Sequence, residues 1–121
     1  MSNKRTQDSL RERLARSSEV NIGVIGRKSG RAITIPVWFV LEGETLYLLP
    51  VYGSDTQWYK NVLKNPLMRI GPADAAELKV VPVTDAKQVS SVVEKFRAKY
   101  GAGDVKKYYS KFDVAVLVPM Q

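Results

Sequence analysis

The residues with the clearest chemistry lie in the turn of residues 26–31, whose sequence is GRKSGR. The side chains there that could hold an anion are Arg27, Lys28, Ser29 and Arg31. Arginine and lysine give charge-assisted hydrogen bonds to phosphate and carboxylate groups, and the two glycines let the backbone approach a ligand closely. No acidic residue occurs between Glu19 and Glu42 to neutralise this charge. The turn is therefore predicted to bind an anion at the mouth of a small β-barrel.

This turn differs from the phosphate-binding loop of nucleotide hydrolases. That loop needs four residues between its glycines and a helix after its Lys-Ser or Lys-Thr pair. Here the segment after the turn begins Ile33-Thr34-Ile35, which is typical of a strand. An anion would therefore be held by side chains and turn amides, without a helix dipole. Taken alone, the turn is more readily interpreted as a charged, solvent-exposed hairpin tip.

The composition limits the chemistry that the chain can perform by itself. Its 121 residues, 45% of them hydrophobic, are enough for one ordered domain over residues 1–121. The sequence has no cysteine and no histidine. This excludes disulfides, thiol nucleophiles and Ser-His-Asp or Cys-His hydrolases, and it removes the commonest zinc ligands. Any catalysis must use a bound cofactor or the side chains of Tyr, Lys, Asp and Glu.

The net charge of +7 and the pI of about 9.7 indicate an anionic partner. The cations are divided among the N-terminus, the turn and residues 85–100, so we expect no nucleic-acid partner. The longest apolar run, residues 33–41, is too short to cross a bilayer, and residues 1–10 lack the apolar core of a secretory signal. We therefore expect a cytoplasmic protein, with weak membrane-surface contact available to its basic N-terminus.

Periodicity predicts strands that alternate with a few helices. We expect residues 1–8 to be a mobile tail, and a short helix over residues 9–17 to pack Leu10 and Leu14 on the barrel. Pro36 cannot donate to a strand ladder, so its position should be an edge, a bulge or a gap that faces a ligand. The predicted strands cover residues 21–25, 33–41, 44–51, 67–71, 77–83 and 112–118.

Two helices are expected to lie against these strands. In the first, over residues 55–65, Ser54 or Asp55 should cap the N-terminus, which makes a catalytic role for Asp55 less favoured. The second begins at Asp85 and ends at Gly101, and its apolar residues recur at helical spacing. One more helical turn is expected over residues 104–109. The fold class is therefore α+β and mainly β: a six-stranded antiparallel split β-barrel with flanking helices.

Several motifs occur together in a fixed order. GRKSGR is followed by Ile35-Pro36-Val37, by Gly53 and by WYKNVLKNP at residues 58–66. Over roughly residues 21–71 this pattern resembles the deazaflavin-dependent nitroreductase family. Members of that family are small split β-barrels of the wider flavin-reductase and pyridoxamine-phosphate-oxidase type.

The resemblance implies binding of coenzyme F420, a deazaflavin with a phosphate and an oligoglutamate tail. It also implies hydride transfer from the reduced ring to a small electron-poor acceptor, a quinone or a nitroaromatic. By the same resemblance, the turn would hold the phosphate and the tail, residues 35–38 would lie along the ring, and residues 58–61 would close the cofactor side. The implied cofactor-binding residues are Arg27, Lys28, Ser29, Gly30, Arg31, Pro36, Val37, Trp38, Trp58, Tyr59 and Asn61.

Three tyrosines are candidate donors to an acceptor oxygen: Tyr52, Tyr108 and Tyr109. Surface positions for these tyrosines, and core positions for Trp38, Trp58 and Tyr59, are the competing interpretation. Trp38 and Tyr52 depart from the family pattern and could either narrow or reshape the pocket. We assign no catalytic residue, because hydride transfer depends mainly on placing donor and acceptor carbons within reach. No metal is expected.

Other functions are compatible with the same sequence. The barrel could bind FMN in place of F420, or it could carry a cofactor without turnover. A nucleic-acid-binding barrel is the least favoured, for the reason given above. The expected partner is a small-molecule electron acceptor, and the expected oligomeric state is a monomer or a homodimer.

Overall fold

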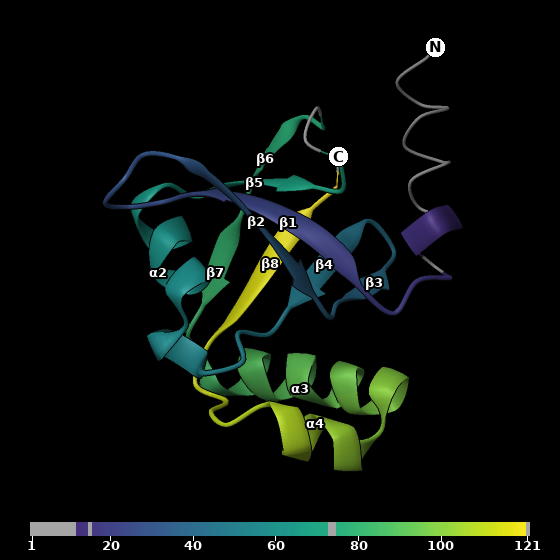
Figure 1. Cartoon of the computed structure of the whole chain (residues 1–121). Helices are drawn as coiled ribbons and strands as arrows, with labels where there is room; N and C mark the ends of the chain where they lie inside the picture. The colour runs from purple at the N-terminus through teal and green to yellow at the C-terminus, as the bar shows by residue number, and fades with distance from the viewer. Residues whose placement is uncertain (1–11, 15, 73–74, 121) are drawn as a thin grey trace.

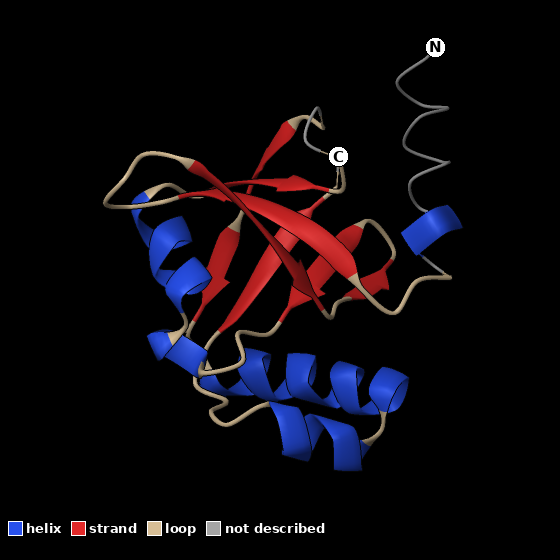
Figure 2. Ribbon diagram, in the orientation of Figure 1, coloured by secondary structure: helices blue, strands red, loops and turns tan. Residues whose placement is uncertain are grey.

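The strands form two four-stranded antiparallel sheets, in a computed structural model that describes residues 12–14, 16–72 and 75–120 (Figures 1 and 2). The first sheet has the order β2 (Ala32–Val37), β1 (Val20–Ile25), β5 (Leu67–Ile70) and β6 (Glu77–Lys79). The second has the order β3 (Val40–Glu42), β4 (Thr45–Leu48), β8 (Ala115–Pro119) and β7 (Val81–Val83). Every ladder between these strands is antiparallel, which confirms the predicted α+β class and strand direction.

The predicted count of six strands is wrong for a local reason. Two of the predicted strands are each interrupted where the chain leaves one sheet and enters the other. The first break, at residues 38–39, separates β2 from β3, and the second, at Val80, separates β6 from β7. The edges of the two sheets are thus joined by continuous chain, but not by a ladder, so the described residues form no closed barrel.

Side chains and backbone outside the sheets satisfy the backbone at both breaks. The Phe39 N–H donates to Tyr100 Oη (3.0 Å) and its carbonyl accepts from Lys99 Nζ (2.9 Å). The Val80 N–H donates to the Pro66 carbonyl (3.0 Å). Since buried backbone groups need partners, these bonds allow both strands to turn the corner.

Two apolar clusters hold the elements together. One fills the space between the sheets and includes Ile22, Phe39 and Leu46, all fully buried. The other lies between the second sheet and the helices α3 (Ala86–Tyr100) and α4 (Ala102–Tyr108), with Phe96 at its centre. Figure 1 shows α3 and α4 beneath the second sheet, and α2 (Gln57–Lys64) beside the first.

The ends of α3 match the prediction from the sequence, whereas the N-terminus of α2 does not. Asp85 caps α3 by accepting from the Gln88 N–H (3.1 Å), and Gly101 follows its last residue with φ 94°. Neither Ser54 nor Asp55 caps α2, because both lie in the short 3₁₀ helix η1 (Gly53–Asp55) and contact the chain near residue 113. Thr56 takes the N-cap position without a side-chain capping bond.

The N-terminal predictions fall partly beyond the part of the chain that the structure describes. The tail of residues 1–8 and Leu10 lie outside the described residues. Residues 12–14 are helical, and Leu14 is buried in the cluster between the sheets. Among the described residues, no helix has the length and apolar character that crossing a bilayer would require.

Pro36 occupies an edge position, which is one of the three places expected for it. It pairs with Asn21 of β1, and β2 is the outer strand of its sheet. Proline has no N–H group to donate, and at the edge of a sheet there is no further strand that needs this donor. The outer side of β2 is therefore open next to the site described below.

Candidate functional site

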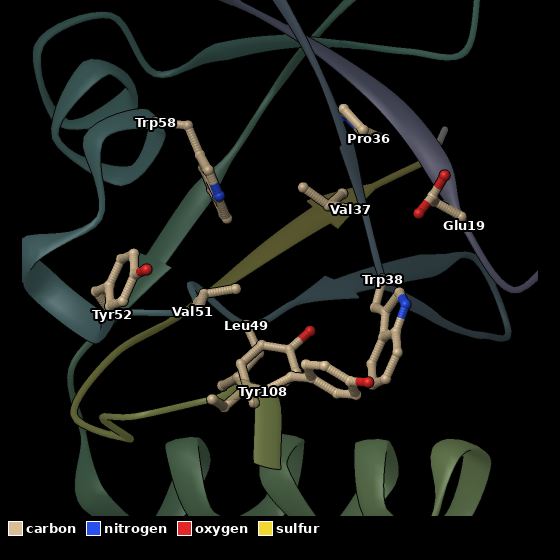
Figure 3. Close-up of a pocket in the computed structure, with 10 residues that line it drawn as sticks. Glu19, Pro36, Val37, Trp38, Leu49, Val51, Tyr52, Trp58 and Tyr108 are labelled. Atoms are coloured by element: carbon tan, nitrogen blue, oxygen red, sulfur yellow. The ribbon is translucent and has the colours of Figure 1, made fainter. Parts of the chain in front are cut away.

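A pocket of about 470 Å³, here called the aromatic pocket, opens between β2, α2 and α4 (Figure 3). Five of its lining residues are aromatic. It is lined by Glu19, Pro36, Val37, Trp38, Leu49, Val51, Tyr52, Trp58, Tyr108 and Tyr109. Aromatic walls with few polar groups suit a flat ring, since most ligand sites are apolar clefts with a small number of polar contacts.

The ends of four elements bring these side chains together. Pro36 and Val37 end β2, and Trp38 is the first residue beyond it. The segment after β4 supplies one wall, and α2 directs Trp58 into the pocket from the opposite side (Figure 3). The last turn of α4 and the residue after it supply two tyrosines. Because element ends rather than one motif build the site, residues far apart in sequence meet there.

Trp38 is fixed by the end of α3. Its ring stacks on Tyr100 with centroids 4.2 Å apart, and Tyr108 approaches it edge-on at 5.5 Å. The Tyr100 hydroxyl accepts from the Phe39 N–H and lies 2.8 Å from both the Phe39 and the Ser18 carbonyl oxygens, to one of which it donates. Burial raises the pKa of Tyr100, so this hydroxyl keeps its proton at neutral pH. These contacts hold the Trp38 ring against the end of α3.

A second, shallower pocket of about 230 Å³, here called the turn pocket, lies at the predicted anion-binding turn. It is lined by Gly26, Arg27, Lys28, Ser29, Ile33, Gln57 and Asn61. The turn is closed by hydrogen bonds from Gly26 N to Arg31 O (2.8 Å) and from Gly30 N to Gly26 O (2.9 Å). Gly30 adopts φ 71°, which glycine tolerates best.

Arg27 links the turn to α2. Its guanidinium donates to Asn61 Oδ1 (2.8 Å) and Gln57 Oε1 (2.8 Å), and its backbone N–H also donates to Asn61 Oδ1 (3.1 Å). Asn61 is only 5% exposed, so its amide oxygen needs these donors. The GRKSGR turn and the WYKN segment, separate in sequence, therefore contact each other directly.

The other two cations of the turn remain available to a ligand. Lys28 and Arg31 are exposed, and no ion pair of their side chains is found among the described residues. The Ser29 hydroxyl accepts from the Arg31 N–H (3.2 Å). An anion in the turn pocket would thus meet Lys28 and the Ser29 hydroxyl, with Arg31 two residues further along the same turn, while Arg27 links the turn to α2.

Both pockets share the same two walls, β2 and α2. Ile33 lines the turn pocket and Val37 lines the aromatic pocket, and alternation places both on one face of β2. Four residues of strand span about 13 Å. On α2, Gln57 and Asn61 face the turn pocket, whereas Trp58 faces the aromatic pocket. A molecule that contacts both pockets would therefore run along β2 and α2, a path here called the groove.

A polar clamp fixes the segment that carries Tyr52. The Asp113 carboxylate accepts from the Ser54 N–H (2.9 Å) and from the Ser54 hydroxyl (2.5 Å). Lys111 Nζ lies 3.2 Å from Asp55 and 3.7 Å from Asp113. Burial alone would raise the pKa of Asp113, but the bonds from Ser54 and the Lys111 charge outweigh it and hold the pKa below its usual value.

The clamp should make stability depend on pH through Asp113. A carboxyl whose pKa is lowered by folding stabilises the fold above its ordinary pKa, and this contribution disappears as the pH falls. We expect Asp113→Asn to melt below wild type at neutral pH, with the difference shrinking once the pH falls below about 3.9. Thermal unfolding across this range measures it, and a difference that is constant with pH would contradict the assignment.

The structure brings most of the sequence-predicted residues to these two pockets. Seven of them line the aromatic pocket: Pro36, Val37, Trp38, Tyr52, Trp58, Tyr108 and Tyr109. Four line the turn pocket: Arg27, Lys28, Ser29 and Asn61. Gly30 and Arg31 belong to the turn but line neither pocket. Tyr59 also lines neither, because it is 3% exposed and packs between the sheets, where burial raises its pKa.

Sequence reasoning missed five lining residues outside the predicted turn. Ile33 lies in the strand that directly follows the turn, where its position next to the turn could have revealed it. Gln57 precedes Asn61 by one helical turn, a spacing that could have revealed it. Val51 adjoins Tyr52, which the sequence did single out. Leu49 and Glu19 carry no local signal, since their positions depend on how the strands pair.

A sequence profile of bacterial proteins described as uncharacterized (DUF2255) matches residues 11–115. The chain belongs to this family. This DUF2255 protein has no match among curated proteins.

Solved structures of other proteins share the fold of this DUF2255 protein at low sequence identity. An F420-H2 dependent reductase (FDR-A) is 18% identical, with 84% of this chain and 93% of that chain covered and a TM-score of 0.61. A candidate 5-nitroimidazole antibiotic resistance protein from Bacteroides thetaiotaomicron is 14% identical, with 93% and 78% covered and a TM-score of 0.68. The heme storage protein HutZ from Vibrio cholerae is 14% identical, with 94% and 89% covered and a TM-score of 0.68.

These likenesses establish a split-barrel-like fold on which several proteins bind cofactors. Because identity is so low, they do not transfer a cofactor to this chain.

Proposed function

We propose that this protein is an F420-dependent oxidoreductase that reduces a small electron-poor acceptor of the quinone or nitroaromatic type. The observation that carries the proposal is that two unlike pockets, one at a cationic turn and one with aromatic walls, lie along the same two elements, β2 and α2. F420 likewise has an acidic end and a flat ring. When bound and reduced, it supplies a hydride, which no amino-acid side chain can supply.

The residues present fit such a ligand. Lys28 and Arg31 would pair with its phosphate and glutamate groups, and the Ser29 hydroxyl and turn amides would add hydrogen bonds. Pro36, Val37 and Trp58 would contact the ring and exclude water from it. Arg27 and Asn61 would act indirectly by holding the turn against α2.

The acceptor would lie in the rest of the aromatic pocket. Tyr52 and Tyr108 are exposed and their hydroxyls have no hydrogen-bond partner among the described residues, so either can donate to an acceptor oxygen. Tyr109 is a weaker candidate donor, since it is only 5% exposed and packs against Phe96.

Removing the unpaired cations of the turn should weaken binding of F420. We expect Lys28→Ala with Arg31→Ala to raise the Kd for F420 about tenfold at low salt, since charge-assisted bonds to phosphate are lost. The effect should shrink at high salt, because exposed charges are screened. Fluorescence titration of F420 against the protein measures the affinity directly.

A matched control removes the same charge elsewhere. Lys60 and Lys64 lie on α2 but line neither pocket, so their double alanine variant should bind F420 within about twofold of wild type. Equal losses in both double variants would mean that only net charge matters, and would refute a specific site at the turn.

The same titration separates the competing cofactors. FMN and hemin serve as the other two ligands. FMN is the alternative cofactor that the sequence leaves open, and hemin is included because the heme storage protein HutZ shares the fold. Preferential binding of FMN would mean that the cofactor of the proposed oxidoreductase is FMN and not F420. Binding of F420 without acceptor-dependent oxidation of its reduced form would point to a non-catalytic cofactor-binding protein.

A further inference from the structure

The aromatic pocket has two sides with different chemistry (Figure 3). Trp58 and Tyr52 lie on the side of α2 and η1, nearest the turn pocket. Glu19 and Trp38 lie on the opposite side, at the far end of the hairpin formed by β1 and β2. The ring of a cofactor held at the turn reaches the first side before the second.

Glu19 is the sole charged side chain among the described residues that line the aromatic pocket. It is exposed, and no hydrogen bond or ion pair of its carboxylate is found within residues 12–14, 16–72 and 75–120. A carboxylate only accepts hydrogen bonds when ionised. It therefore attracts cations and repels anions at this side of the pocket.

The strand register places Glu19 opposite Trp38 at the open end of the β1–β2 hairpin. Val20 pairs with Val37, so Glu19 precedes and Trp38 follows the last pair of the β1–β2 ladder. Tyr100 covers one face of the Trp38 ring and holds the ring in place. A cation near an indole is attracted by the ring as well as by a neighbouring carboxylate.

Two basic residues lie near this wall, Lys99 and Lys107, and neither forms an ion pair with Glu19 among the described residues. Lys107 Nζ lies 5.3 Å from the centroid of the Tyr108 ring. Lys99 Nζ lies 3.6 Å from the centroid of the Phe39 ring and 5.1 Å from that of Tyr100, and it donates to the Phe39 carbonyl. Desolvation lowers the pKa of Lys99. Its ammonium is thus directed at Phe39 rather than at the pocket.

We propose that the Glu19–Trp38 side of the aromatic pocket is a subsite for a flat, positively charged aromatic molecule. The two ends of the groove then select opposite charges: the turn selects an anionic group and the far side of the pocket selects a cationic ring. Naming this molecule as the electron acceptor rests on the proposed function, whereas the charge preference of the subsite does not.

Binding of a matched series of two-ring compounds tests the subsite without any cofactor. Quinoline is neutral, 1-methylquinolinium is cationic and quinoline-4-carboxylate is anionic at about pH 7.5. The chain has two tryptophans, and both line this pocket, so their two indole N–H signals in NMR spectra report binding. Trp58→Phe assigns the two signals.

We expect the cation to bind about threefold more tightly than quinoline at low salt and to shift the Trp38 signal more than the Trp58 signal. Glu19→Gln should abolish this preference and leave the affinity for quinoline within about twofold. Asp104→Asn, which removes a carboxylate of α4 outside the pocket, should leave the preference intact.

Three results would overturn the proposal: equal affinities for cation and neutral ring, a preference that survives Glu19→Gln, or no binding of either compound. Because F420 is absent from the experiment, these results leave the cofactor assignment untouched. Conversely, failure of F420 to bind would not alter the charge preference measured here.

Discussion

Gly53→Ala is expected to destabilise the fold by about 3 kcal/mol or more and to lower its melting temperature by roughly 10 °C. Gly53 has φ 56°, a conformation that residues with a Cβ adopt at a cost. A Cβ there would also overlap Asp113 Oδ1 and lie 2.9 Å from Lys111 Cγ. The clamp between Ser54 and Asp113 would have to open.

Two other glycines separate the causes of this loss. Gly30 has φ 71° with open space around its Cα, so Gly30→Ala should cost about 1 kcal/mol from backbone strain alone. Gly103 lies in α4 with ordinary φ and open space, so Gly103→Ala should be neutral or stabilising by up to about 1 kcal/mol. Thermal unfolding of the three variants measures the series. Similar effects at Gly53 and Gly30 would contradict the role of the clamp.

Tyr100→Phe is expected to cost about 1–3 kcal/mol, because the Phe39 N–H loses its acceptor at the corner between β2 and β3. The ring remains, so its stacking on Trp38 and its packing on Phe96 are retained. The loss therefore reports on the hydroxyl. Denaturant unfolding measures it, with an unchanged m-value if the native fold persists.

The matched control for this substitution is Tyr108→Phe. Tyr108 is 51% exposed and its hydroxyl has no hydrogen-bond partner among the described residues, so removing this hydroxyl should change stability by less than about 0.5 kcal/mol. Equal small effects in the two variants would mean that water replaces Tyr100 at the corner.

The parts of the fold that local pattern determines could be predicted from the sequence. The α3 helix follows from its apolar spacing, its Asp85 cap and Gly101. The breaks in two strands could not be predicted, because the apolar run of residues 33–41 is uninterrupted where β2 ends. That break depends on Tyr100 and Lys99, some sixty residues later.

In the site, too, local motifs could be predicted from the sequence, whereas contacts between distant segments could not. The motifs indicated the turn and the α2 segment, but not that Arg27 joins them through Asn61. Gly53 belonged to the motif, yet its partner Asp113 lies far along the chain. Nothing in the local sequence marked Glu19 as a site residue, since only the β1–β2 register places it opposite Trp38.

The most direct test of the groove compares F420 with its deazaflavin core, which lacks the phosphate and the glutamates. If one ligand spans the turn and the aromatic pocket, wild-type protein should bind both, with intact F420 about tenfold tighter at low salt and the ratio approaching one at high salt. Equal affinities at low salt, or binding of neither compound, would contradict it.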